Sequence, residues 1–184
     1  MNSRNELMVR TSGFEGYAKE YGHVGEFITI TCPSRMHARF SKSGEANPKY
    51  HGTTPREALY YLCKQWNKIR SFLKRNDFNV YGFRVAEPQH DGTPHWHLLV
   101  FMPPEQVKPV IKAMRHYALE FDGREPGAQK HRFTTVSIDW SKGSAAGYIA
   151  KYISKNIDGY NVGEDLYGND AVESAERVIA WKTT

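Results

Sequence analysis

Residues 92–102 read GTPHWHLLVFM, a turn-forming start followed by an apolar run. Glycine and proline favour turns, and a short apolar run that follows them is typical of a buried strand. Residues 80–87 have the same strand-like character, and the connection between the two stretches, PQHDGTP, is rich in turn residues. We therefore expect an antiparallel hairpin of residues 80–87 and 95–102, with the rest of the fold arranged around it.

The segments on either side of this hairpin alternate between strand and helix patterns. Residues 27–32 are rich in β-branched side chains and are expected to form a first strand. Residues 54–57, TPRE, combine a capping box with proline at the first helical position and start a helix with apolar residues at helical spacing. Residues 107–121 show a second helical pattern, and residues 132–139 alternate like a strand.

The order strand, helix, strand, strand, helix, strand is the split βαβ order of ferredoxin-like folds. It predicts an α+β protein with a central antiparallel sheet and helices packed on it. A third helix is expected over residues 144–157, while residues 1–22 carry no clear pattern. We expect one domain over residues 1–184, with a core at 23–159 and a C-terminal extension at 160–184, and the abrupt end favours a fragment of a longer protein.

Composition limits the classes of function. A chain of 184 residues can bury a core without disulfides or a structural metal, so metal chemistry would serve function. The net charge of +5 favours a polyanionic partner such as nucleic acid. Cys32 and Cys63 lack a CxxC spacing and are expected to be buried, reduced thiols. Without a secretory leader or an apolar run of ~18 residues, we expect a cytoplasmic protein with no membrane partner.

The hairpin carries a candidate metal site. His95 and His97 flank Trp96, so both imidazoles point to the same side of the strand. If the hairpin loop comprises residues 88–94, Glu87 lies opposite His95 and shares its face. These three side chains form a set that suits zinc, manganese or magnesium in a Lewis-acid role.

Two alternatives to this site stay open. A slip of one residue would turn Glu87 to the other face, and His90 and Asp91 at the hairpin tip would then be the fallback ligands. Alternatively, His95 and His97 form a stacking pair with no metal.

The predicted third helix reads SAAGYIAKYISKNI. Its alanines and isoleucines gather on one face, and Tyr148, Lys151, Tyr152 and Lys155 gather roughly opposite. A phenol has a pKa near ~10 and attacks poorly unless a cation or metal helps to form the phenolate, which the lysines could assist. The structural alternative is an amphipathic helix with packed tyrosines and solvated lysines.

A basic segment precedes the first predicted helix. Residues 33–53 have a loop-like composition, and the candidate contacts to a nucleic-acid backbone are Arg35, His37, Arg39 and Lys42. A solvated loop without a partner is the alternative interpretation.

GTPHWH with its upstream glutamate, together with GYIAKYISK, resembles the HUH endonucleases, and in particular the replication gene A protein family of temperate double-stranded DNA phages. The resemblance covers residues 31–38 (TCPSRMHA), 85–101 (VAEPQHDGTPHWHLLVF), 147–159 (GYIAKYISKNIDG) and, more loosely, 173–178 (ESAERV). The paired tyrosines with interleaved lysines are its specific element. Members of this family initiate rolling-circle replication with two tyrosines.

The resemblance implies a sheet that carries the metal, with the tyrosine helix laid over it. It implies a strand-specific DNA nickase in which Glu87, His95 and His97 hold Mg²⁺ or Mn²⁺, with Zn²⁺ also compatible. Tyr148 or Tyr152 would attack the scissile phosphate, giving a 5′-phosphotyrosine and a free 3′-OH that primes synthesis. The implied partners are single-stranded origin DNA and host replication machinery, with the protein acting as a monomer.

Two other functions compete with the nickase. A non-catalytic ferredoxin-like module would bind nucleic acid by stacking bases on exposed sheet aromatics, and would not need an acid and two histidines on one face. A zinc hydrolase could use a His₂Glu set, but such enzymes usually present HExxH on a helix.

The tyrosine pair yields a direct test. Tyr148→Phe and Tyr152→Phe should each keep some covalent adduct with single-stranded origin DNA, because the remaining hydroxyl, one helical turn away, still reaches the phosphate. The double Phe variant should give no adduct on a denaturing gel. Phe keeps the ring and its packing, so an adduct from a folded double variant would place the nucleophile elsewhere, with Tyr160 the nearest candidate.

Overall fold

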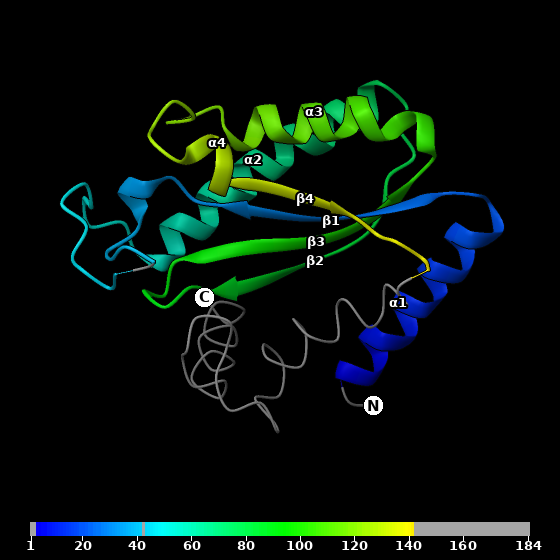
Figure 1. Ribbon diagram of the computed structural model, residues 1–184, viewed down its shortest axis with the longest axis horizontal. Coiled ribbons are helices and arrows are strands. Elements are labelled where there is room, and N and C mark those ends of the chain that lie inside the picture. The colour runs from blue at the N-terminus through cyan, green and yellow to red at the C-terminus, as the bar shows by residue number, and fades with distance from the viewer. Residues whose placement is uncertain (1–2, 42, 142–184) are drawn as a thin grey trace.

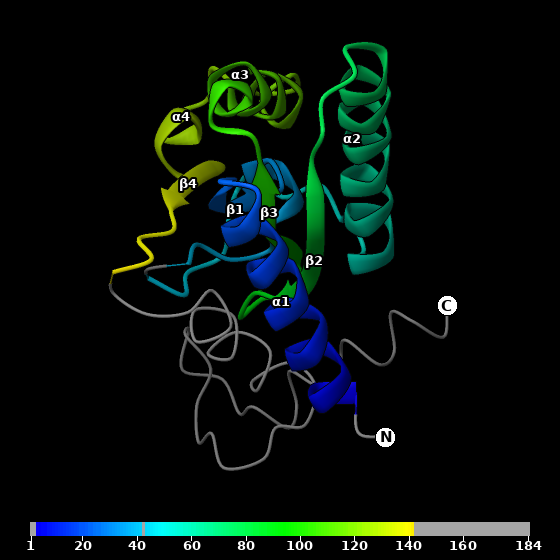
Figure 2. The ribbon, with the colours of Figure 1, turned by 90° about the vertical axis from the view of Figure 1, so that its right-hand side faces the viewer.

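The computed structural model describes residues 3–41 and 43–141, drawn as ribbons in Figures 1 and 2. Its elements are α1 (Ser3–Glu20), β1 (Val24–Thr31), the short 3₁₀ helix η1 (Ser34–Met36), α2 (Pro55–Arg75), β2 (Tyr81–Pro88), β3 (Pro94–Met102), the 3₁₀ helix η2 (Pro104–Gln106), α3 (Val107–Ala118), α4 (Ala128–His131) and β4 (Phe133–Ser137). The helix predicted over residues 144–157 lies outside the described residues.

The four strands form one sheet in the order β2-β3-β1-β4, and every neighbouring pair is antiparallel. This is the sheet order of a split βαβ fold, so the predicted α+β class is confirmed. Strand β3, the strand with the two histidines, lies inside the sheet, and all of its residues are buried. The apolar run at residues 94–102 is therefore a buried strand, as its composition predicted.

Helices α2 and α3 cover one face of the sheet (Figure 1). Alternate residues of β3, among them Trp96, Leu98 and Val100, point into the core on that side. Leu98 is fully buried, and burying a leucine of this kind stabilises the fold by about 1.5–3 kcal/mol. The predicted capping box of α2 is present, because the Thr54 hydroxyl accepts from the Glu57 backbone N–H and the Glu57 carboxylate accepts from the Thr54 N–H.

Helix α1 covers part of the opposite face, and the sequence did not reveal it. The ring of Phe14 lies 5.8 Å from that of Tyr81 and 6.5 Å from that of Phe101, measured between centroids, and Ala18 is fully buried. Glycines at positions 13 and 16 weaken the intrinsic helix propensity by roughly 1 kcal/mol each. Packing on the sheet, not local propensity, therefore holds this helix.

Smaller differences concern element ends and the cysteines. Helix α3 ends at Ala118, short of the predicted limit, and Phe121 is 47% exposed in the turn that follows. Cys32 and Cys63 are free thiols, as expected, with Cys32 buried and Cys63 partly buried. Burial raises the pKa of the Cys32 thiol and keeps it protonated. Within the described residues, none of the helices has the length and apolar character needed to cross a membrane.

Gly82 is required where β2 meets β3. Its φ is +140°, and a Cβ at this position would lie 2.0 Å from the carbonyl oxygen of Leu99. We expect Gly82→Ala to lower the free energy of unfolding by about 2 kcal/mol or more, because the backbone would be strained and the strands pushed apart. Urea denaturation measures the change. The matched control is Gly13→Ala in α1, where a Cβ meets nothing within 4 Å, and a gain of about 0.5–1 kcal/mol is expected. Equal effects at the two glycines would contradict this assignment.

Candidate metal centre

The predicted hairpin register is confirmed, and it brings three ligand atoms together. Glu87 pairs with His95 across β2 and β3. The Oε2 atom of Glu87 lies 3.0 Å from Nε2 of His95 and 2.6 Å from Nε2 of His97, and the two nitrogens are 3.1 Å apart. Atoms that each lie about 2.1 Å from one ion, at right angles, are themselves about 3 Å apart. The triangle therefore fits one face of an octahedral metal site.

Burial and hydrogen bonding prepare the charge state of this cluster. Glu87, His95 and His97 are 0%, 1% and 6% exposed. Burial disfavours the carboxylate, but hydrogen bonds and charge from the two histidines outweigh it and lower the pKa of Glu87 to about 2. Burial, together with the charge of His97, lowers the pKa of His95. An anionic carboxylate beside a neutral imidazole is the state that divalent ions bind.

A second observation on the carboxylate agrees with a metal site. Its other oxygen, Oε1 of Glu87, is buried and has no hydrogen-bond partner in the part of the chain that the structure describes. A buried oxygen without a partner carries a desolvation cost that a bound ion would offset. Beside the one oxygen and two nitrogens that converge, Oε1 is thus a fourth donor atom.

Neighbouring side chains orient both imidazoles. Thr29 of β1 lies opposite His97, and its Oγ1 is 3.0 Å from Nδ1 of that ring. The ring of Phe27 stacks on His97 with 5.5 Å between centroids. The amide nitrogen Nε2 of Gln89 lies 3.1 Å from Nδ1 of His95. The Thr29 hydroxyl can accept from Nδ1–H of His97, which keeps that proton on Nδ1 and leaves Nε2 free to ligate. Gln89 instead presents a donor to Nδ1 of His95, so it fixes the orientation of that ring and places no proton on Nδ1.

Thr29 and Gln89 were not anticipated from the sequence. Thr29 stands on the strand predicted at residues 27–32, but its neighbour in the sheet was not assigned, so its pairing with His97 had no local signal. Gln89 lies in the hairpin connection PQHDGTP, which was interpreted only as a turn. Thr29 could be assigned only with the pairing of β1 and β3, whereas Gln89 lies six residues from His95 in the same hairpin.

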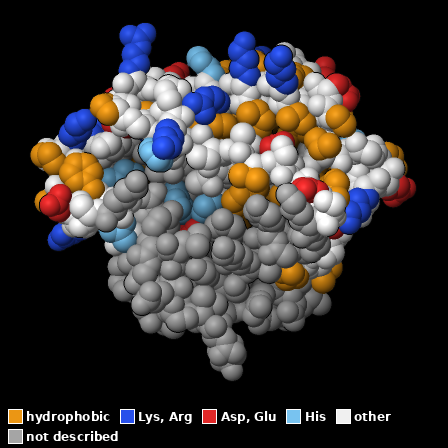
Figure 3. Space-filling view, in the orientation of Figure 1, with side chains coloured by type: hydrophobic (Ala, Val, Ile, Leu, Met, Phe, Trp, Pro, Cys, Tyr) orange, Lys and Arg blue, Asp and Glu red, His pale blue; other side chains and the backbone are white. Residues whose placement is uncertain are grey.

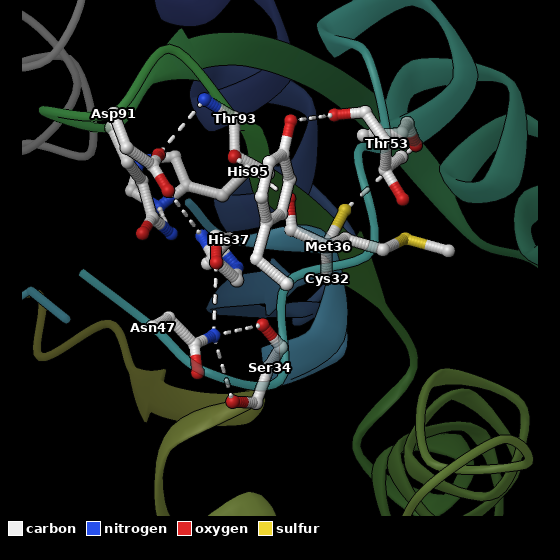
Figure 4. Close-up of polar contacts among 12 residues, drawn as sticks. Cys32, Ser34, Met36, His37, Asn47, Thr53, Asp91, Thr93 and His95 are labelled. Atoms are coloured by element: carbon white, nitrogen blue, oxygen red, sulfur yellow. Dashed lines mark hydrogen bonds and ion pairs between the residues drawn. The ribbon is translucent and has the colours of Figure 1, made fainter. Parts of the chain in front are cut away.

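The fallback ligands at the hairpin tip are not part of the cluster. Asp91 is paired with His37 instead, at 3.2 Å between Oδ2 and Nδ1 (Figure 4). Burial raises the pKa of Asp91, but the bond to His37 outweighs it and lowers the value to about 2. The ring nitrogens of His90 are buried and have no hydrogen-bond partner among the described residues.

The structure describes three of the four residues that were predicted to contact DNA. Arg35 is engaged with Asp122, at 2.6 Å, and with His51. His37 holds Asp91, as described above. Arg39 is exposed and donates to the carbonyl oxygen of Gly44. Lys42 lies outside the described residues. Contact with DNA remains a prediction for all four.

The predicted nucleophiles also fall outside the described residues. Tyr148, Lys151, Tyr152 and Lys155 belong to residues 142–184, drawn in grey in Figure 3. Figure 3 shows histidine side chains gathered on the left half of the visible face. The catalytic role of the two tyrosines and the two lysines stays a prediction.

Comparison with known proteins identifies the family. The sequence profile of the bacteriophage replication gene A protein matches residues 2–160. The chain belongs to this family. The matched region contains the whole Glu87, His95, His97 cluster and both predicted tyrosines.

Individual relatives from phages and prophages agree with this assignment. The replication gene A protein of Escherichia phage 186 is 49% identical over 184 residues, covering 97% of this chain and 26% of that protein. The replication protein of Haemophilus phage HP1 is 44% identical, covering 97% and 23%. A probable replication endonuclease from a prophage-like region of Salmonella paratyphi A is 41% identical, again covering 97% and 23%. The chain spans about a quarter of the length of these relatives.

The hydroxyl of Thr29 provides a test of the metal centre. Thr29→Val keeps the shape but removes the group at Nδ1 of His97, so affinity for Mn²⁺ should fall by about 10–100-fold with little change in the melting temperature. Isothermal titration calorimetry measures this affinity. Thr134→Val is the matched control, because Thr134 pairs with Thr29 from β4 and is exposed. Unchanged Mn²⁺ affinity in the Thr29 variant would remove this residue from the metal site.

Proposed function

We propose that this chain is the nicking and strand-transfer unit of a phage replication initiator, a metal-dependent endonuclease that acts on single-stranded DNA. The observation that carries the proposal is the buried triangle of Glu87, His95 and His97, whose ligand atoms converge from two adjacent strands. Membership of the replication gene A family supports it, as does the name of the prophage relative, a probable replication endonuclease.

In this proposal the cluster binds a divalent ion through Glu87 Oε2 and the Nε2 atoms of His95 and His97. When bound, Mg²⁺ or Mn²⁺ would polarise the scissile phosphate and stabilise the charge that develops on it. Thr29 and Gln89 hold the two rings so that the ligand atoms keep their positions. Burial keeps water from competing for the carboxylate.

The proposed chemistry is a transesterification. The hydroxyl oxygen of Tyr148 or Tyr152 forms a bond to phosphorus, the bond from phosphorus to the 3′ oxygen breaks, and that oxygen takes up a proton. The phosphotyrosine ester retains the bond energy, so a later 3′-OH can reverse the step without ATP. Lys151 and Lys155 would favour the phenolate and neutralise the phosphate.

The remaining elements of the proposal concern partners. The substrate is single-stranded DNA at a replication origin. The chain acts as a monomer in the bacterial cytoplasm, and its partner there is the host replication machinery. Of the predicted backbone contacts, Arg39 is the best candidate, because it is exposed and bound only to a carbonyl among the described residues. Arg35 would first have to release Asp122.

A covalent-adduct assay tests this function. The protein is mixed with single-stranded DNA from the origin of its phage, with Mn²⁺ or with EDTA, and the products are separated on a denaturing gel. We expect adduct only with metal, and a loss of about 10³-fold or more in His97→Ala, because a ligand is removed. His116→Ala is the matched control, since His116 is exposed on α3, and it should behave as the wild type.

Other results would each contradict a part of the proposal. Cleaved DNA with no attached protein would indicate hydrolysis, as expected of a zinc hydrolase. Binding without cleavage in either condition would favour the non-catalytic module. Full activity in a folded His97→Ala variant would separate the cluster from the chemistry.

A further inference from the structure

A second candidate site lies on the other face of the sheet. A groove of about 710 Å³ runs between α2 and the edge strand β2, and we call it the α2–β2 groove. Figure 2 shows α2 beside this edge of the sheet. The lining residues that bear on its chemistry are Trp66, Arg70, Lys74, Phe78, Gly82 and Arg84. The metal cluster uses none of them.

Among the described residues, the charged side chains that line the α2–β2 groove are all positive. Arg70 and Lys74 lie one helical turn apart on α2 and are both exposed, and Arg84 comes from β2. No aspartate or glutamate lines the groove, and none of the three cations has an ion pair within the described part of the chain. Helix α2 as a whole carries six Lys or Arg and one Glu. Such a set of unpaired cations fits a polyanion.

Arg84 lies over two aromatic rings. Its guanidinium carbon lies 3.9 Å from the ring centroid of Trp96 and 5.4 Å from that of Trp66. Cation–π contacts of this kind restrain the guanidinium without using its N–H groups, which can then donate to phosphate oxygens. Trp66 and Phe78 are partly buried and add apolar surface on which sugars or bases can pack.

The side chains of the groove favour a single nucleic-acid strand over a peptide or a duplex. A peptide added to the free edge of β2 would pair with backbone groups and would have no need of three cations. A sugar–phosphate backbone carries one negative charge per nucleotide and can meet all three. The bases of a single strand are also free to pack on Trp66 and Phe78, whereas a duplex keeps its bases stacked on one another.

We propose that the α2–β2 groove binds the sugar–phosphate backbone of single-stranded DNA, on the sheet face opposite to the metal cluster. The proposal rests on the proposed function, because it extends the path of the same DNA strand. Arg84 and Glu87 are three residues apart on β2, so they face opposite sides, about 10 Å apart along the strand. DNA leaving the cluster would pass around the β2 edge to reach the groove.

The test measures binding to DNA without metal. Fluorescence anisotropy of a labelled 20-nucleotide oligo(dT) is recorded in EDTA over a range of NaCl concentrations. For Arg70→Ala/Lys74→Ala we expect the salt slope to fall by about 1.4, from roughly 0.7 for each phosphate contact, and the affinity to fall about 25-fold at 0.1 M salt. The matched control is Lys108→Ala/Lys112→Ala, an exposed pair at the same spacing on α3, which should retain the wild-type slope.

Further arms make each outcome decisive. Arg84→Gln should weaken binding on its own. If this variant does not fold, the Arg70→Ala/Lys74→Ala variant still tests the groove, because both of its side chains are exposed. Equal slopes for the groove pair and the control pair would overturn the proposal. The proposal would also be overturned if the Arg70→Ala/Lys74→Ala variant lost affinity for a 20-base-pair duplex as strongly as for oligo(dT), or if it lost affinity only for polyglutamate. Because EDTA prevents metal-dependent cleavage, a failure here leaves the adduct assay of the proposed function unaffected.

Discussion

The register between β2 and β3 is the constraint on which this structure depends. With Glu87 opposite His95, one face of the hairpin presents three metal-ligating side chains, and the other presents Trp96 and Leu98 to the core. A shift of one residue would exchange the two faces, burying the histidines under α2 and exposing the core residues. The same pairing therefore specifies both the fold and the candidate site, and neither can change alone.

The features that could be predicted from the sequence are those that depend on residues close together in the chain. The hairpin and the capping box at Thr54 depend on neighbours in sequence, and the structure confirms them. Helix α1 was missed because its stability comes from Phe14 and Ala18 packing on distant strands. Thr29 was missed for a similar reason, since its partner His97 is 68 residues away along the chain. Contacts between residues far apart in the chain do not produce a periodic pattern in the sequence.

The polar groups around the cluster show how a sheet accommodates buried charge. Glu87 is fully buried, yet its pKa is lowered because two imidazoles act as hydrogen-bond partners. Asp91 stays ionised beside His37 in the same way, at the tip of the same hairpin. Each carboxylate is compensated by histidine and not by arginine or lysine. Histidine compensates without a permanent charge, so a cation can replace its proton at the cluster.

The rigidity of the two strands has a consequence for the choice of ion. Three ligand atoms held about 3 Å apart by a paired backbone match one face of an octahedron, so the other ligands of an ion would have to come from groups outside these two strands. A half-shell of this kind cannot close around an ion and select it by size. It discriminates through the chemistry of nitrogen and carboxylate donors alone, which several first-row divalent metals satisfy. The ion in use would then be set by which of these metals the surroundings of the protein supply.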